Sequence, residues 1–187
     1  LGAIHQGPRA VEDLRRTMAE VLATFRPGRN GWLSGILGGK RVEKLLFAAT
    51  KADHLHHSQH PALTGIMQAM LHDAISRADF AGAETLALSM ASLRCTVEET
   101  IIRDGVSHDA VRGKLLSTGK QAAMYPGELP LDPTRLLSPA REGAQRWLDA
   151  DYGLMEFAPA RASLKPGFGP PHIRLDRAAE FLIGDRV

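Results

Sequence analysis

The sequence has little cysteine, few aromatic residues and almost no net charge. Cys95 is the single cysteine among 187 residues, so no disulfide can form within the chain, and a reducing, cytoplasmic compartment is expected. Lys and Arg total 23 against 21 acidic residues, and the resulting net charge of +2 is too small to indicate nucleic-acid binding. No apolar run approaches the roughly 20 residues of a membrane-spanning helix. A hydrophobic fraction of 44% excludes a wholly disordered chain.

The beginning of the chain suggests a piece of a longer protein. The first residue is Leu1 and not a methionine, and no basic start with an apolar core, as in a signal peptide, follows it. Residues 1–4 are interpreted as the end of a strand whose earlier part is absent.

The first half of the chain has the alternation of helix and strand that is typical of an α/β domain. Apolar residues recur every three or four positions over residues 8–25 and 60–80, which predicts two amphipathic helices, and residues 32–37 predict a shorter one. The apolar run 44–50 predicts a strand covered on both faces, and residues 85–91 predict a second strand. Strand, helix and strand in this order predict a parallel sheet.

A β-hairpin is predicted at the start of the second half. Asp104-Gly105 is a strong tight-turn signal between residues 97–103 and 106–116, which would form the two strands. A helix over residues 96–103 is the alternative, because Glu98 and Glu99 are poor strand residues.

The rest of the second half is rich in proline. Eight of the eleven prolines lie within residues 126–171, where we expect loops and short strands, one of them over residues 152–157. Residues 175–182 predict a last short helix that ends at Gly184. The sequence contains no internal repeat and no low-complexity tract.

Thr50-Lys51-Ala52-Asp53, at the end of the first predicted strand, is the main candidate for a binding site. Ligands of open α/β sheets bind just outside the carboxyl ends of the strands. The two carboxylate oxygens of Asp53 can accept two parallel hydrogen bonds from the edge of a guanine base, and adenine offers no such pair of donors there. The aliphatic stem of Lys51 can lie along the flat base. A solvated Lys/Asp pair in a strand-to-helix loop is the alternative interpretation.

Four segments resemble the YcjX-like family, bacterial stress-associated proteins of the P-loop NTPase class with a Ras-like GTP-binding domain. The first is KLLFAATKADHLHHSQHP, which contains the candidate motif. The others are GPRAVEDLRR followed by FRPGRNGWLSGILG, then AMYPGELPLDP, and finally PHIRLDRAAEFLIGDRV. They occur in the family's order along nearly the whole chain.

The resemblance implies an α/β fold in two parts. Residues 1–95 would be the base-recognition half of a Ras-like, P-loop NTPase domain, with a partial parallel sheet and its helices. Residues 96–187 would be a family-specific, Pro-rich extension with the hairpin and the final helix. The full-length protein would bind GTP or GDP with Mg²⁺, hydrolyse GTP slowly as a switch in a stress response, and act on a protein partner that the sequence does not name. An ATP-binding member of the same class is the alternative.

The resemblance also assigns roles to individual residues. Thr50, Lys51 and Asp53 would recognise guanine, with Thr50 where most GTPases carry Asn, a change that weakens the contacts tying the loops together. In the loop Ser89-Met90-Ala91-Ser92, the backbone N–H of Ala91, beside Met90, would meet the guanine carbonyl.

The sequence lacks the phosphate-binding motif G-x-x-x-x-G-K-[S/T]. Gly38-Gly39-Lys40-Arg41 does not fit, because Ser34 replaces the first glycine and Arg41 replaces the serine or threonine. The phosphate loop, the Mg²⁺ ligands and the switch segments are therefore expected upstream of Leu1, and no catalytic residue is expected in this chain.

Three other features have weaker interpretations. His54, His56, His57 and His60 could form a non-catalytic module that binds Zn²⁺, a similar ion or a partner, with His56 and His60 spaced for one helical face. No cysteine or acidic helix motif accompanies them, and a polar loop beside the nucleotide is favoured. The basic residues near Trp32 favour a solvated surface over nucleic-acid contact; they are Arg26, Arg29, Lys40 and Arg41. The sequence shows no general base near Cys95 that could activate it as a nucleophile. A role as a small, buried apolar residue is therefore favoured.

Overall fold

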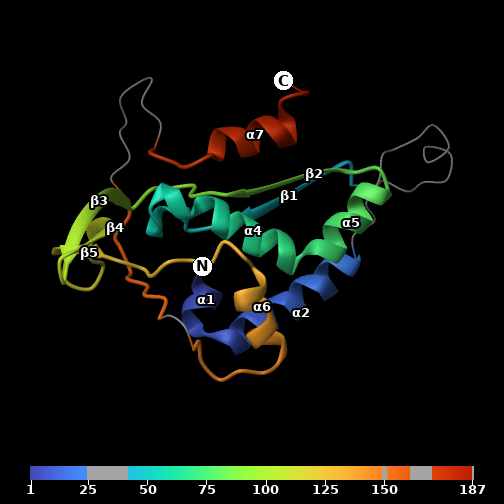
Figure 1. Cartoon of the computed structure of the whole chain (residues 1–187). Coiled ribbons are helices and arrows are strands. Elements are labelled where there is room, and N and C mark those ends of the chain that lie inside the picture. The colour runs from blue at the N-terminus through green and yellow to red at the C-terminus, as the bar shows by residue number, and fades with distance from the viewer. Residues whose placement is uncertain (25–41, 149–150, 161–169, 187) are drawn as a thin grey trace.

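The computed structural model describes residues 1–24, 42–148, 151–160 and 170–186 (Figure 1). The predicted segment 32–37, the basic residues around it and Gly38–Arg41 lie outside these ranges. None of the helices in the described ranges has the length and hydrophobicity that crossing a membrane requires. In chain order the elements are α1 (Gly2–Gln6), α2 (Pro8–Thr24), β1 (Lys44–Ala49), the 3-10 turns η1 (Ala52–His54) and η2 (His57–Gln59), α4 (His60–Met70), α5 (His72–Phe80), β2 (Glu84–Ser89), β3 (Thr96–Arg103), β4 (Val106–Lys114), β5 (Gln121–Met124), α6 (Thr134–Arg141) and α7 (Leu175–Ile183).

The beginning of the chain is helical, so the strand predicted for residues 1–4 is wrong. Helix α1 ends at Gly7, whose N–H bonds to the carbonyls of Ala3 and Ile4 and whose φ of 109° only glycine adopts readily. Ile4 is buried in the core. Four small or apolar residues are too short a pattern to tell a helical turn from a strand.

The parallel sheet is confirmed. Strands β1 and β2 pair in parallel, from Lys44 opposite Glu84 to Ala49 opposite Ser89. The second strand thus ends two residues before the predicted end at Ala91. Helix α7 lies over one face of this sheet, and α2, α4 and α5 lie over the other (Figure 1).

Side chains of β1 alternate between these two layers. Phe47 packs with Met67 and Leu71 of the helical layer formed by α2 and α4, whereas Leu46 and Ala48 join the cluster under α7. This alternation has the period of two that a strand imposes. The prediction of a strand covered on both faces is therefore confirmed.

The helix predicted over residues 60–80 is two helices, α4 and α5, which meet at Leu71. Leu71 has φ −107° and ψ 14°, and its side chain is buried against Phe47 and Met67. No glycine or proline marks this break, and the apolar spacing continues through it. Periodicity therefore predicted helix correctly on both sides and could not locate the change of direction.

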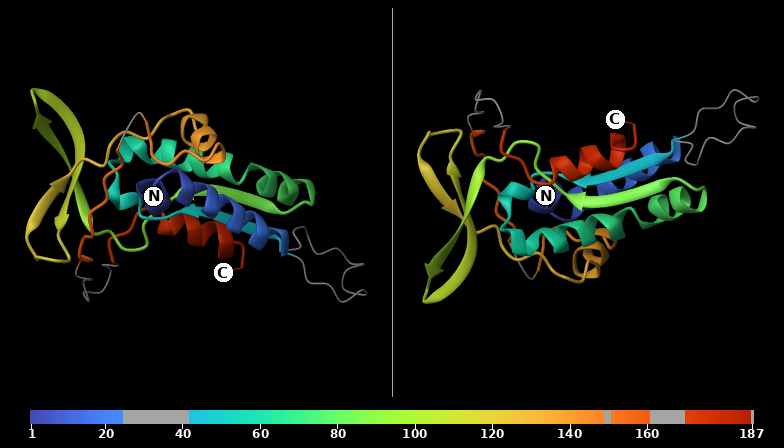
Figure 2. Two further views of the ribbon diagram at one scale, coloured as in Figure 1. Left: turned by 90° about the horizontal axis from the view of Figure 1, so that it is seen from below. Right: turned by 90° about the horizontal axis from the view of Figure 1, so that it is seen from above.

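The hairpin is confirmed, and the helical alternative over residues 96–103 is wrong. Strands β3 and β4 pair antiparallel around Asp104 (φ 52°) and Gly105 (φ 77°), the two positive φ angles that a type I′ turn requires. Glu99 is accommodated in the strand because its carboxylate accepts a 2.6 Å hydrogen bond from Arg112. Strand β5, which was not predicted, adds a third strand, and this sheet forms one end of the molecule (Figure 2).

The Pro-rich segment contains a helix that was not predicted. Helix α6 begins after Pro133, where the Asp132 carboxylate accepts hydrogen bonds from the N–H and hydroxyl of Thr134, and it contains Pro139. A helix of eight residues tolerates one missing N–H donor near its end. The strand predicted over residues 152–157 is also wrong, since only Phe157 forms an isolated bridge. The final helix, α7, is confirmed and is followed by Gly184.

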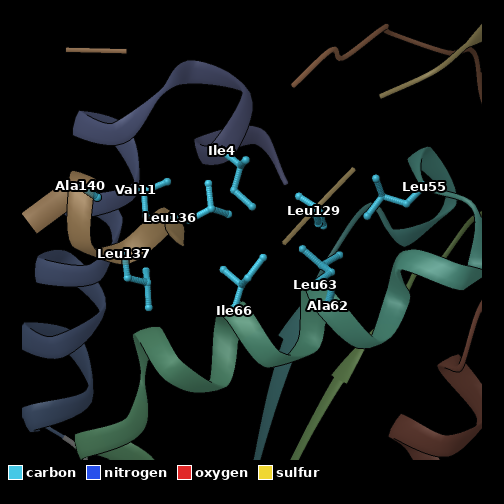
Figure 3. Packing of buried hydrophobic residues seen from close by; sticks show 10 residues of the cluster. All are labelled: Ile4, Val11, Leu55, Ala62, Leu63, Ile66, Leu129, Leu136, Leu137 and Ala140. Atoms are coloured by element: carbon cyan, nitrogen blue, oxygen red, sulfur yellow. The ribbon is translucent and has the colours of Figure 1, made fainter. Parts of the chain in front are cut away.

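The largest hydrophobic cluster joins distant parts of the chain (Figure 3). Helices α1, α2, α4 and α6 and the loop containing Leu129 all contribute to it. The core therefore includes segments on both sides of residue 95. Its buried members are Ile4, Val11, Leu55, Ala62, Leu63, Ile66, Leu129, Leu136, Leu137 and Ala140.

Candidate functional site

The loops that follow β1 and β2 lie side by side at the carboxyl edge of the parallel sheet. The N–H of Met90 donates to the carbonyl of Ala49 at 2.9 Å, and the N–H of Ala52 donates to the carbonyl of Met90 at 3.1 Å. These bonds continue the pairing beyond the ends of the strands. The two segments predicted to contact the base, residues 50–53 and 90–91, are therefore adjacent in the structure.

Lys51 turns the chain sharply at the end of β1. Its φ of 62° and ψ of 35° are left-handed, which is uncommon for a residue other than glycine and concentrates at turns and functional sites. The turn leaves Thr50 and Lys51 exposed and directs Ala52 and Asp53 into the protein. The ammonium group of Lys51 therefore lies in solvent, whereas the carboxylate of Asp53 lies inside the protein.

Asp53 is only 4% exposed and is held by the residues that lead into β3. Its Oδ2 accepts a hydrogen bond from the N–H of Cys95 at 2.8 Å, and its backbone carbonyl accepts one from the hydroxyl of Thr96. A buried carboxylate is costly unless donors face it, and its two oxygens can accept up to about four hydrogen bonds. Among the described backbone groups, the Cys95 N–H donates to the carboxylate, and the Thr96 hydroxyl fixes the backbone behind it.

Cys95 holds Asp53 through its backbone N–H, and its thiol lies beside the same carboxylate. Burial, the nearby charge of Asp53 and a hydrogen bond to Asp53 raise the pKa of the Cys95 thiol, which favours the protonated thiol over the thiolate. The side chain packs beside Val111, Met124 and Phe157. The apolar surroundings predicted for Cys95 are observed, but the predicted burial is incomplete, because the residue is half-buried.

Ala91, the predicted second contact to the base, is engaged with the segment before α7. Its N–H donates to the carbonyl of Ile173 at 3.1 Å, and its carbonyl accepts from the N–H of Ile173 at 2.8 Å. Met90 and Ala91 are both buried. A ligand carbonyl could reach the Ala91 N–H only after Ile173 releases it.

His60 and Arg174 hold the loop after β1 through hydrogen bonds, an arrangement that the sequence did not predict. The Nε2 of His60 lies 2.8 Å from the carbonyl of Ala52, and its Nδ1 lies 3.0 Å from Nη1 of Arg174. Because arginine can only donate, Nδ1 accepts and Nε2 carries the proton that binds Ala52. The same Nη1 is 3.0 Å from the carbonyl of Ser89. Burial, with the nearby charge of Arg174, lowers the pKa of His60 and keeps it neutral.

The four histidines of this region do not form one cluster, and the helical face predicted for His56 and His60 is wrong, because α4 begins at His60 and His56 precedes η2. His60 points toward Ala52, whereas the His56 and His57 rings are tilted by 40° with centroids 4.3 Å apart. His54 is buried, and its Nδ1 has no hydrogen-bond partner within the described residues. Burial lowers the pKa of His54 as well.

An apolar groove of about 610 Å³ lies beside β1, and Thr50 is among its lining residues. It is lined by side chains of α1, α2, β1 and α4. Among the described residues, β1 pairs with β2 alone, so its second edge faces this groove.

Comparison with known proteins gives one consistent result. The sequence profile of the YcjX-like family, DUF463, matches residues 1–187. A protein of Escherichia coli (strain K12) named "Ras-like GTPase YcjX" is 35% identical over 187 residues, which are 100% of this chain and 38% of that protein. A protein of the same name from Shewanella oneidensis is 26% identical over 187 residues, 99% of this chain and 36% of its own length. The chain thus spans less than two fifths of the length of these curated relatives.

Proposed function

Because the chain belongs to the YcjX-like family, we propose that it forms the base-recognition part of a GTP-binding protein with a P-loop NTPase fold. The ligand is GTP or GDP, in accord with relatives named Ras-like GTPases. Slow GTP hydrolysis and a role in the stress response, which the family resemblance implies, belong to the same proposal.

The observation that carries this proposal is the fixed carboxylate of Asp53 at the carboxyl edge of a parallel sheet. Guanine has two neighbouring N–H donors, on N1 and on the exocyclic amine, and a carboxylate can accept from both. The Cys95 N–H and the Thr96 hydroxyl hold Asp53 before any ligand binds. A pre-positioned acceptor costs little ordering entropy on binding, which favours affinity as well as selectivity.

The remaining base contacts come from the same loop and from the loop after β2. Lys51 is exposed at the turn, where its aliphatic stem would cover one face of the base. Thr50 has a shorter polar side chain than asparagine and would make fewer contacts between the loops. The guanine carbonyl would accept from the Ala91 N–H in exchange for the Ile173 carbonyl that now occupies it.

Phosphate and Mg²⁺ binding are assigned to parts of a longer protein. The sequence contains no G-x-x-x-x-G-K-[S/T] motif, and phosphoryl transfer depends on that loop and its metal ion. The open edge of β1 and the apolar groove beside it are where further strands of such a sheet would pack. Under this proposal residues 1–95 supply the base site and residues 96–187 buttress it.

Asp53→Asn in a protein of the relatives' full length tests the assignment. An amide donates one hydrogen bond where the carboxylate accepted it, so GDP binding should weaken by roughly a hundredfold, the loss of one to two charge-assisted hydrogen bonds. Xanthosine diphosphate carries a carbonyl in place of the exocyclic amine and should bind the variant better than the wild type. ADP binding should not change.

Asp13→Asn is the matched control, since Asp13 is exposed on α2 far along the chain from the loop. It should leave all three affinities unchanged. Unaltered GDP binding by Asp53→Asn would remove Asp53 from the base site, and displacement of GDP by equimolar ADP would favour an ATP-binding protein.

A further inference from the structure

A second site lies beside the base loop, where two consecutive histidines meet a glutamate from the hairpin. His56 and His57 belong to the loop between η1 and α4, and Glu98 belongs to β3, 41 residues further along the chain. One ligand atom from each residue lies within 4.8 Å of the other two. The sequence identified the histidines as possible metal ligands but not Glu98, because only the folded hairpin places Glu98 beside them.

The spacing of these atoms suits a small metal ion. Glu98 Oε2 lies 2.8 Å from His57 Nδ1 and 3.8 Å from His56 Nε2. A tetrahedral Zn²⁺ ion with bonds of about 2.0–2.2 Å separates its ligand atoms by roughly 3.3–3.6 Å. The two carboxylate–imidazole distances would therefore each change by about half an ångström or less on metal binding, and the two imidazole nitrogens lie within 4.8 Å of each other.

Neighbouring side chains orient two of the three groups. His56 Nδ1 lies 2.8 Å from the Ser58 hydroxyl and 3.2 Å from Asp109 Oδ2, and it accepts a long hydrogen bond of 3.4 Å from the Ser58 N–H. Metal binding through Nε2, which lies 3.8 Å from Glu98 Oε2, would place the proton on Nδ1, where the Ser58 hydroxyl and the Asp109 carboxylate can accept it in place of the Ser58 N–H contact. A carboxylate behind a histidine ligand is a recurring feature of metal sites, because it fixes the tautomer and makes the imidazole more basic.

An arginine binds the other oxygen of Glu98, and His57 leaves the site open to solvent. Arg94 Nη2 lies 3.6 Å from Glu98 Oε1 and engages the oxygen that faces away from the histidines. The His57 side chain is 68% exposed, so an ion can enter from solvent and keep a water molecule as a further ligand. Imidazole nitrogen with one carboxylate is a donor set that favours Zn²⁺, Ni²⁺ or Cu²⁺ over Mg²⁺ and Ca²⁺.

We propose that His56, His57 and Glu98 bind a divalent transition-metal ion of the Zn²⁺ type, with Asp109 positioning His56. The ion would fasten the hairpin to the loop after Asp53, because His56 follows Asp53 by three residues and Glu98 follows Cys95 by three. Since the Cys95 N–H already binds the Asp53 carboxylate, the metal adds a second link between the same two segments.

Equilibrium dialysis against Zn²⁺ alone, on the untagged protein, tests the site without any nucleotide. One ion should bind per chain, and His57→Ala or Glu98→Gln should each weaken binding by about 10- to 100-fold. Glu98→Gln keeps the shape of the side chain, and circular dichroism should show both variants folded. Co²⁺ in place of Zn²⁺ should give an absorption spectrum of a four-coordinate ion, and a large excess of Mg²⁺ should not displace either metal.

Two further variants separate a built site from surface binding. Asp109→Asn should weaken Zn²⁺ binding by about tenfold through loss of the orientation of His56. His72→Ala with Glu84→Gln, exposed residues of the same types outside the cluster, should bind as the wild type does. No bound metal, or equal losses in the cluster variants and the control, would overturn the proposal.

Discussion

Arg174 and His60, 114 residues apart in sequence, lie 3.0 Å from each other between Nη1 and Nδ1. The contact links the segment before α7 to the first residue of α4. His60 in turn donates a hydrogen bond to the Ala52 carbonyl, and Arg174 donates one to the Ser89 carbonyl at the end of β2. One arginine thus holds both loops of the proposed base site, the β2 loop directly and the β1 loop through His60.

Arg174→Ala should destabilise the protein by about 1–3 kcal/mol, because it leaves the buried His60 Nδ1 and the Ser89 carbonyl without this donor. Urea unfolding measures the change. Arg177→Ala, an exposed substitution one turn further along α7, is the control and should change the free energy of unfolding by less than about 0.5 kcal/mol. Equal stability of Arg174→Ala and Arg177→Ala would show that the contact with His60 is not important for the fold.

The neutral His60 predicts that stability falls in mild acid. His60 is 3% exposed, burial lowers its pKa, Arg174 faces it, and the carboxylate of Glu98 opposes the shift more weakly. As the pH falls below about 6.5, the unfolded chain binds a proton that the folded chain resists, so the free energy of unfolding decreases until the folded-state pKa is passed. Stability is therefore fully present above that unfolded-state value.

The measurement is urea unfolding at about pH 8 and about pH 5.5 for the wild type and His60→Gln. Glutamine can still donate to the Ala52 carbonyl but does not titrate, so the difference between the two pH values should shrink. The part that remains includes His54, whose pKa burial also lowers. An unchanged difference in the variant would contradict the assignment to His60.

Local patterns in the sequence predicted those parts of the fold that depend on neighbouring residues. The apolar run of β1 and the Asp104-Gly105 turn are examples, because a buried strand and a type I′ turn each impose their own residue types. The break at Leu71 and the helix around Pro139 are different, since packing and one carboxylate cap decide them. Residue patterns within each segment therefore could not predict where α4 ends or that α6 forms.

The candidate site likewise has a part that the sequence predicted and a part that it did not. The motif Thr50–Asp53 and its place after β1 were predicted, and so was its proximity to Met90. The partners that fix the site were not predicted, because they come from distant segments: Cys95 for Asp53, Ile173 for Ala91, and Arg174 for His60. Such pairs leave no signal in a single sequence, because either residue alone has an ordinary surface or core interpretation.

Gly113 on β4 gives the sharpest test of how the hairpin supports Asp53. A Cβ atom built on Gly113 would lie 2.5 Å from Cδ1 of Phe157 and 3.1 Å from the carbonyl of Cys95, and Phe157 is itself buried. Gly113→Ala should therefore force Phe157 or the Cys95 backbone to move, at a cost of about 1–3 kcal/mol by urea unfolding. Because the Cys95 N–H holds the Asp53 carboxylate, GDP affinity of the full-length protein should fall as well.

Gly65→Ala is the matched control for the same chemical change. A Cβ on Gly65 meets nothing within 4 Å, and Gly65 lies inside α4, where alanine is the better helix former. This substitution should stabilise the protein by about 0.5–1 kcal/mol and leave GDP binding unchanged. The two variants should therefore shift stability in opposite directions. If Gly113→Ala were as stable as Gly65→Ala and bound GDP normally, close packing of β4 against Phe157 and Cys95 would not be what holds Asp53 in place.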